Sequence, residues 1–378
     1  MKNETPFFQD LRERIRALGG IFNAHLHLDR SGTYHETNEM LSAGTSGAET
    51  SSLSLSAKHS LIPAIHASHF YDDEDLANRV NVFLDLMVNA GTTRADTLVD
   101  VTSDRVKLSA LKQFLALKRE RQGTLDIQVG AYSPLGYKDS EPERWDLLTE
   151  AAAMADFIGA LPERDDQADY PDHIGFDEHC RRMLLLSQQF GKPLHIHVDQ
   201  KNYPLEEGTE RIIKLMRELG IPPPSATDEP MLWLIHVISP STYEEGRFRR
   251  LLDSMAENRI GVICCPSAAI SMRQLRPIMT PTFNSIARVL DFLAAGIPVR
   301  IGSDNICDIT SPAGTADMLD EIFVLCNAIR FYDVDILAKL GAGRELAPAE
   351  IARVREHLKR DEAEVQRVVE AYRKATAG

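Results

Sequence analysis

Short apolar runs alternate with longer amphipathic stretches from about residue 94 onward, and one further apolar run lies near the amino terminus. Runs of four to eight β-branched or apolar residues are typical of buried strands, whereas apolar residues that recur every three to four positions are typical of helices. The pattern predicts eight strands, at 21–29, 94–101, 125–133, 156–162, 193–199, 231–238, 261–267 and 298–304.

Amphipathic stretches fill the gaps between these runs, and several end at a glycine, where helices commonly stop. The clearest helical patterns are 73–91, 109–121, 176–191, 205–220 and 285–296. Strands joined by crossover helices form a parallel sheet. We therefore expect an α/β protein with a single (β/α)8 TIM-type barrel over residues 1–378. A doubly wound open sheet is the alternative that shares this local pattern, but no G-x-G-x-x-G follows a strand.

Two segments lie outside the alternation. Residues 31–70 form a long insertion after the first strand, and its part 31–60 is rich in Ser, Thr and Gly. This predicts a long βα loop, which is either a lid over the barrel mouth or a surface insertion. Residues 343–378 predict a charged C-terminal helix packed outside the barrel, with His357 exposed to solvent.

Composition narrows the possible partners and compartment. The chain has 42 Lys and Arg against 56 Asp and Glu, a net charge of -14, which would repel nucleic acid and anionic membrane surfaces. No stretch approaches the roughly 20 apolar residues of a membrane span, and the amino terminus has no signal-like run, so we expect a cytoplasmic protein. Five cysteines without C-x-x-C spacing fit reduced thiols. The oligomeric state, a homo-oligomer included, is left open.

Two histidines end the first predicted strand. His25 and His27 are two residues apart, so their side chains point to the same side of a strand and can bind one cation together. Such a pair is a weak motif alone, because chance gives about 0.4 pairs for this histidine content. The spacing recurs on the fifth strand at His195 and His197.

The candidate residues all fall at the carboxyl ends of predicted strands, because His236 ends the sixth strand and Asp304 the eighth. Barrels place their active sites at this end. Three imidazoles and a carboxylate there make a good site for one divalent metal with a position left for water. The metal would lower the pKa of that water and supply hydroxide to attack a carbonyl or amidine carbon. Asp304 and His236 are placed to handle the proton.

The sequence resembles the amidohydrolase superfamily, specifically its cytosine-deaminase-like branch. The resemblance runs from about residue 20 to 320, through HLHLDR, GTTRADTLVDV, SALKQFLALKRERQGTLDIQVGAY, ADFIGALP, PLHIHVDQ, IHVIS and GSDNICDITSPAGTADML. The last block looks closest to the s-triazine amidohydrolases of that branch. Many relatives flank the barrel with a small β-sandwich built from both termini, whereas this sequence is expected to be a stand-alone barrel.

The resemblance implies one divalent metal ion, most often zinc, with iron or manganese as alternatives. Its ligands would be His25, His27, His197 and Asp304, and His236 would be catalytic or polarise the substrate. Two-metal relatives commonly carry a carboxylated lysine on the fourth strand, and 156–162 has no lysine. The implied activity is hydrolysis of a carbon–nitrogen bond, by deamination or dealkylamination, in a small N-heterocycle or cyclic amide.

The sequence departs from the family at Gln200. Deaminases of this branch have a glutamate there that protonates the leaving amine, and an amide cannot shuttle protons. Three alternatives follow: Asp304 and His236 manage both transfers, Asp199 substitutes, or the protein is a catalytically silent metal- or ligand-binding barrel. The triazine enzyme also lacks this glutamate, so Gln200 is kept among the catalytic candidates. A substrate-reading Gln after the third strand is missing too, which makes cytosine itself doubtful.

Three further residues are candidate substrate contacts. Arg30 would bind a carbonyl oxygen or an anionic ring, or would pair with a structural aspartate. Asn305 lies in the SDNI motif, and His195 faces the same way as His197 but one layer deeper, with an interior role as the alternative. We expect Asp29 to accept a hydrogen bond behind the ligands.

Four histidines lie in or next to the insertion, namely His35, His59, His66 and His69. Most are expected to face solvent, and one to reach the substrate.

Overall fold

The computed structural model describes residues 5–34, 37, 53–225, 228–271 and 284–376. One eight-stranded parallel sheet, in the order of the sequence, forms the centre of the molecule. Its strands are β1 (Ile21–Leu26), β2 (Thr92–Asp100), β3 (Asp126–Tyr132), β4 (Phe157–Ala160), β5 (Leu194–Val198), β6 (Leu232–His236), β7 (Gly261–Cys264) and β8 (Val299–Ile301). Each overlaps its predicted range.

The sheet closes where the chain that follows β8 meets β1. The backbone N–H of His27 donates to the Asp304 carbonyl at 3.0 Å, and the N–H of Asp304 donates to the His25 carbonyl at 2.9 Å. Leu26 and Asp304 form a parallel bridge at this point. Because a doubly wound sheet would leave two open edges, the predicted TIM-type barrel is confirmed. The closure also holds Asp304 beside the two histidines of β1.

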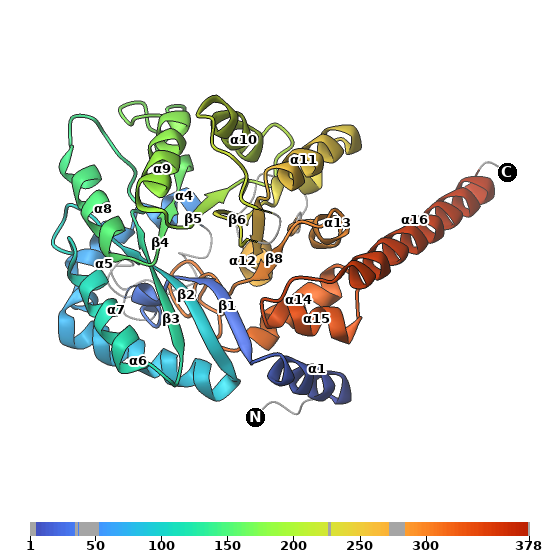
Figure 1. Ribbon diagram of the computed structural model, residues 1–378, viewed down its shortest axis with the longest axis horizontal. Helices are drawn as coiled ribbons and strands as arrows, with labels where there is room; N and C mark the ends of the chain where they lie inside the picture. The colour runs from blue at the N-terminus through green and yellow to red at the C-terminus, as the bar shows by residue number, and fades with distance from the viewer. Residues whose placement is uncertain (1–4, 35–36, 38–52, 226–227, 272–283, 377–378) are drawn as a thin grey trace.

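Helices alternate with the strands and surround the sheet (Figure 1). The α-helices are α1 (Pro6–Ala17), α4 (Leu55–His59), α5 (Ile62–Ala67), α6 (Asp73–Ala90), α7 (Ser109–Glu120), α8 (Glu143–Met154), α9 (Phe176–Phe190), α10 (Gly208–Glu218), α11 (Glu245–Glu257), α12 (Pro266–Ser271), α13 (Val289–Ala294), α14 (Met318–Ala328), α15 (Val334–Gly341) and α16 (Pro348–Thr376). Short 3-10 turns are η1 (Leu28–Arg30), η2 (His69–Tyr71), η3 (Pro162–Asp165) and η4 (Ser239–Thr242).

Helix α6 shows how the predicted pattern forms its element. Its buried residues recur every three to four positions, as the helical period requires for one face packed on the barrel: Leu76, Val80, Leu84 and Met87. Gly91 then takes a φ of 100°, the left-handed conformation that stops a helix at little cost for glycine.

The C-terminal helix begins a few residues later than predicted, because α15 ends at Gly341 and a loop precedes Pro348. Residues 359–374 of α16 are exposed, and the helix extends away from the barrel (Figure 1). His357 is half-buried with its ring centroid 4.9 Å from that of Phe331, so the expectation that it faces solvent is wrong.

Every strand in the described ranges belongs to this one sheet. Within the same ranges, no helix has the length and apolar character needed to cross a bilayer. The five cysteines are free thiols, and Cys264 and Cys265 are buried at the end of β7. The single-domain, stand-alone barrel and the cytoplasmic compartment stay predictions.

Candidate metal centre and active-site cavity

Four side chains that are far apart in the sequence meet at the carboxyl end of the barrel. His25 and His27 lie at the end of β1, His197 lies on β5, and Asp304 follows β8. All four are buried, and one ligand atom from each lies within 4.8 Å of the others. The structure thus brings together the four residues predicted to hold the metal, whereas their metal binding stays a prediction.

The spacings fit a single tetrahedral ion. Ligand atoms about 2.1 Å from a tetrahedral zinc lie about 3.4 Å from one another. Here the Nε2 atoms of His25 and His197 are 3.2 Å apart. Asp304 Oδ1 lies 3.4 Å from His25 Nε2 and 3.6 Å from His27 Nε2. A donor set of three imidazoles and one carboxylate suits zinc, iron or manganese.

The backbone fixes the tautomer of one of these histidines. His197 Nδ1 lies 3.0 Å from the Ala160 carbonyl oxygen and donates its proton to it. The lone pair of His197 is therefore on Nε2, which faces the cluster. The Nδ1 atoms of His25 and His27 are buried without a hydrogen-bond partner in the described part of the chain. The structure therefore fixes the tautomer for His197 alone.

Burial keeps these histidines neutral. It lowers the pKa of His25 to about 3, and the nearby positive charge of Arg30 adds to the effect. Burial and the neighbouring His25 likewise lower the pKa of His197 to about 3. The pKa of His27 is also well below its usual value, first because of burial and then because of Arg30. Since neutral imidazole is the form that binds metals, the cluster is ready to do so at neutral pH.

His236 faces the same carboxylate from β6. Its Nε2 lies 3.8 Å from Asp304 Oδ2, and burial lowers the pKa of His236 to about 3. The backbone is left-handed at both residues, with φ of 76° at His236 and 61° at Asp304. Such conformations are uncommon outside glycine and cluster at functional sites. The two predicted proton-handling groups are thus close enough to act together.

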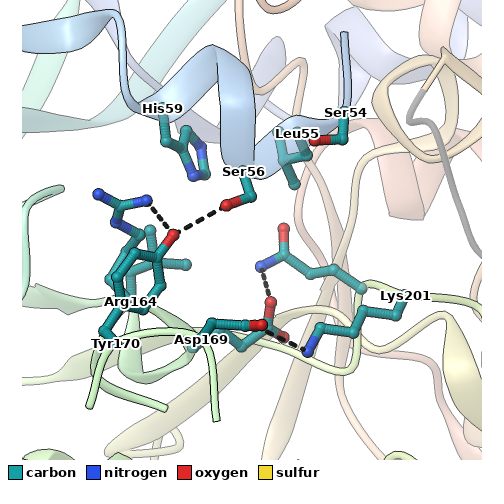
Figure 2. Close-up of a pocket in the computed structure, with 11 residues that line it drawn as sticks. Ser54, Leu55, Ser56, His59, Arg164, Asp169, Tyr170 and Lys201 are labelled. Atoms are coloured by element: carbon teal, nitrogen blue, oxygen red, sulfur yellow. Dashed lines mark hydrogen bonds and ion pairs between the residues drawn. The ribbon is translucent and has the colours of Figure 1, made fainter. Parts of the chain in front are cut away.

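A cavity of about 220 Å³ opens at the barrel mouth, between α4 and the loops that follow β4 and β5 (Figure 2). Leu55, Ser56 and His59 of α4 lie on one side of it, and Tyr170 and Lys201 lie across from them. A smaller cavity is lined by Leu55 and reaches Asp304. Leu55 of α4 thus lines both cavities, and Asp304 lines the smaller one.

Helix α4 is the described part of the insertion that covers this mouth. Its Ser56 hydroxyl is 2.8 Å from the Tyr170 hydroxyl, and its Lys58 Nζ donates to the Thr310 carbonyl at 3.2 Å. The lid role of the insertion stays a prediction. Residues 35–36 and 38–52 of the predicted loop, including His35, lie outside the described residues.

Gln200 lines the cavity and contacts a carboxyl group that the sequence analysis missed. Its Nε2 donates to Glu163 Oε2 at 3.2 Å. Glu163 lies in η3, three residues after the end of β4, and also lines the cavity. Burial and the charge of Glu206 raise the pKa of Glu163 well above its usual value. The available signal was an acidic residue directly after a predicted strand end.

Asp199 is not among the residues that line the cavity, and its carboxylate is hydrogen-bonded to the first backbone N–H groups of α10. Its Oδ1 accepts from the Gly208 N–H at 2.8 Å, and its Oδ2 accepts from the Thr209 N–H at 3.0 Å. The Thr209 hydroxyl also donates to Oδ2. The alternative in which Asp199 replaces the family's glutamate is therefore disfavoured.

A buried charge network lies behind the β1 histidines. Arg30 Nε is 3.7 Å from Asp100 Oδ2, which matches the alternative of pairing with a structural aspartate. Burial alone would lower the pKa of Arg30, but Asp100 and Asp29 more than offset this and raise it. Asp29 Oδ2 accepts from the Asp100 N–H at 2.8 Å and from the Tyr71 hydroxyl at 3.0 Å. Asp29 also lies with His27 and Asp100 in a second buried group of possible metal ligands, so its role as a hydrogen-bond acceptor rather than a ligand stays a prediction.

The other candidate substrate contacts lie away from the main cavity. His195 packs against Phe157 and Trp233, with ring centroids 4.4 and 6.5 Å apart, which favours the interior role. Asn305 is buried and donates from Nδ2 to Asp308. Substrate contacts by Arg30, Asn305 and His195 stay predictions.

The histidines of the insertion differ from one another. His59 lines the cavity, and burial followed by the charge of Arg30 lowers the pKa of His59 to about 3. His66 is buried between two aspartates, so the expectation of solvent exposure is wrong for it. His69 is exposed as expected.

The closed barrel, the strand-end histidines and the aspartate form the arrangement that the sequence motifs predicted. No family model matches the chain. An uncharacterized protein of Haemophilus influenzae is 26% identical over 298 residues, which span 76% of this chain and 95% of that protein. A pterin deaminase of Rhizobium rhizogenes is 20% identical over 261 residues, which span 69% of this chain and 55% of that protein.

Solved structures share the fold. The 5-methylcytosine deaminase of Klebsiella pneumoniae superimposes with a TM-score of 0.69 and 23% identity, over 82% of this chain and 69% of that chain. The N-isopropylammelide isopropylaminohydrolase of Burkholderia multivorans gives a TM-score of 0.64 and 21% identity, over 86% of this chain and 74% of that chain. The predicted amidohydrolase resemblance is confirmed at the level of fold, and the fold alone does not favour the triazine enzyme over the deaminase.

Proposed function

We propose that this protein is a metal-dependent hydrolase that cleaves an exocyclic carbon–nitrogen bond, by deamination or dealkylamination, in a small nitrogen heterocycle or cyclic amide. The observation that carries the proposal is the convergence of His25, His27, His197 and Asp304 at the mouth of a closed barrel. Three supporting observations are the cavity beside α4, its size suited to a small molecule, and the activities named for the similar proteins.

The proposed reaction assigns separate roles to metal-binding, proton-accepting and cavity-covering residues. His25, His27, His197 and Asp304 would hold one divalent ion, which when bound supplies Lewis-acid charge and lowers the pKa of a coordinated water. His236 Nε2 and Asp304 Oδ2 lie 3.8 Å apart, and together they would take the proton from the attacking water. Helix α4 covers the cavity and limits the entry of bulk water.

A catalytically silent, metal-binding barrel is the second candidate. Gln200 favours it, because an amide occupies the position where related deaminases have their proton-donating glutamate. Glu163 beside Gln200 counts against it, since the cavity does contain a carboxyl group.

An assay of the metal-loaded protein separates the two candidates. Zinc, iron and manganese forms are incubated in single-turnover amounts with aminopyrimidines, aminotriazines and aminopteridines, and the release of ammonia or amine is measured. We expect one substrate class to turn over in the wild type and not in an Asp304→Asn variant. Stoichiometric metal without product from any member of the panel would favour the silent barrel.

A further inference from the structure

We infer that Glu163 is the acid that protonates the departing amine, in place of the glutamate that is absent at position 200. This inference rests on the proposed function and adds a named proton donor to it. The geometry carries it, because Glu163 lines the cavity and its Oε2 accepts a hydrogen bond from Gln200 Nε2 at 3.2 Å.

The segment that carries Glu163 also orients a predicted metal ligand. The Ala160 carbonyl accepts the proton of His197 Nδ1 at 3.0 Å, and Glu163 follows three residues later in η3. Gln200 lies three residues after His197. The chain therefore presents the Glu163 carboxyl group beside the position where a residue-200 side chain enters the cavity.

The surroundings of Glu163 favour its protonated form. Burial and the negative charge of Glu206 both disfavour a charged Glu163 and raise its pKa well above its usual value. Glu206 Oε2 already accepts from the Lys201 N–H at 2.9 Å and from the Ser239 hydroxyl. Glu163 Oε1 is buried and has no donor in the described part of the chain. The proton therefore belongs on Glu163, and Gln200 keeps its Oε2 in place.

The proposed step balances in atoms and charge. The oxygen of a water molecule bonds to the ring carbon, the electron pair of the ring C=N bond moves to the ring nitrogen, and one water proton passes to Asp304. The Glu163 proton then bonds to the exocyclic nitrogen, and the carbon–nitrogen bond breaks with its pair on the amine. The ring C=N bond re-forms, the product leaves as its hydroxy-imine tautomer, and the proton on Asp304 returns to Glu163 through solvent.

The test compares two substrates that share one ring but carry different leaving groups, an amine and a chloride. Both are assayed with the full-length, metal-loaded protein. An amine needs protonation to leave, whereas chloride does not. For Glu163→Gln we expect kcat to fall about 100-fold or more with an amino-substituted pyrimidine or triazine, and to change less than about threefold with its chloro analogue. The Glu163→Gln, Gln200→Glu double variant moves the carboxyl group to the neighbouring side chain and should recover part of the lost rate with the amine. Glu207→Gln makes the same substitution at an exposed residue and should leave both rates unchanged.

The outcomes separate this inference from the proposed function. If kcat of Glu163→Gln falls equally with both leaving groups, while its metal content and melting temperature are those of the wild type, the acid role is refuted. The proposed hydrolytic function would still stand. Unchanged rates with both would overturn the acid role as well. A wild type that releases no amine from any ring would refute the proposed function, and the inference with it. If Glu163→Gln does not fold, Glu163→Asp, which keeps the acid but shortens it, is expected to show the same dependence on leaving group to a smaller degree.

Discussion

The buried ion pair at His66 predicts a loss of stability in mild alkali. His66 Nδ1 lies 2.7 Å from Asp104 Oδ2, and its Nε2 lies 3.0 Å from Asp100 Oδ2. Burial alone would lower the pKa of His66, but hydrogen bonds to Asp100 and Asp104 raise it from 6.5 to about 9. The folded protein thus binds this proton more tightly than the unfolded chain does.

The size and sign of the effect follow from that difference. A raised pKa contributes stability that is fully present below the unfolded value of 6.5 and is lost as the pH rises through about 9. At about 1.4 kcal/mol per pKa unit, the contribution is about 3 kcal/mol at its maximum. His66→Gln retains a similar shape but carries no titrating proton, so its stability should lack this pH dependence.

The assay is urea unfolding of the wild type and His66→Gln at pH 6, 7, 8, 9 and 10, with the same metal concentration throughout. The difference between the two free energies of unfolding should shrink by about 3 kcal/mol from the lowest to the highest pH. A difference that stays constant over this range would show that His66 is not charged in the folded protein, and the reasoning would fail.

Three more predictions concern the site. His27→Ala should retain well below one metal per chain by elemental analysis, against about one for the wild type, because it lacks a direct ligand. Gly302→Ala should lose about 1–3 kcal/mol in chemical denaturation and bind metal more weakly, because its new Cβ would lie 2.8 Å from the Cβ and carbonyl oxygen of His25. Tyr170→Phe removes the hydrogen bond to Ser56 that holds α4, and we expect KM to rise by about fivefold with kcat little changed.

Each of these has a control and a contrary result. Alanine at exposed His69 should keep the metal content of the wild type, and full occupancy in His27→Ala would contradict the ligand assignment. Gly246→Ala, where a new Cβ would meet no atom closer than 3.6 Å, should not lose stability, and an equal loss at Gly246 and Gly302 would exclude a steric cause. An unchanged KM in Tyr170→Phe would mean that α4 is held in place by other contacts.

The strand-end residues were predictable because two regularities fix them. Side chains alternate along a strand, and each βα unit returns the chain to the same end of the barrel, so spacing alone placed His197 and Asp304 with His25. The hydrophobic pattern predicted the parallel strands, but a doubly wound sheet shares that pattern, so the pattern alone did not decide their order.

The loop residues were not predictable in this way. Glu163 meets Gln200 because the turn after β4 folds toward the loop after β5, and no sequence periodicity encodes that approach. His66 looked exposed because it follows a Ser- and Gly-rich segment, yet α5 carries it inward to Asp100. Long-range pairing of polar side chains, rather than local pattern, decides these positions.

The left-handed backbone at His236 and Asp304 sets a limit for engineering heat tolerance into this barrel. Each such residue holds about 1–3 kcal/mol of strain, and glycine would release it while deleting an imidazole or a carboxylate. Gains in melting temperature will therefore have to come from the amino-terminal end of the strands and from the surrounding helices, where no reactive group competes with the chain's preferred conformation.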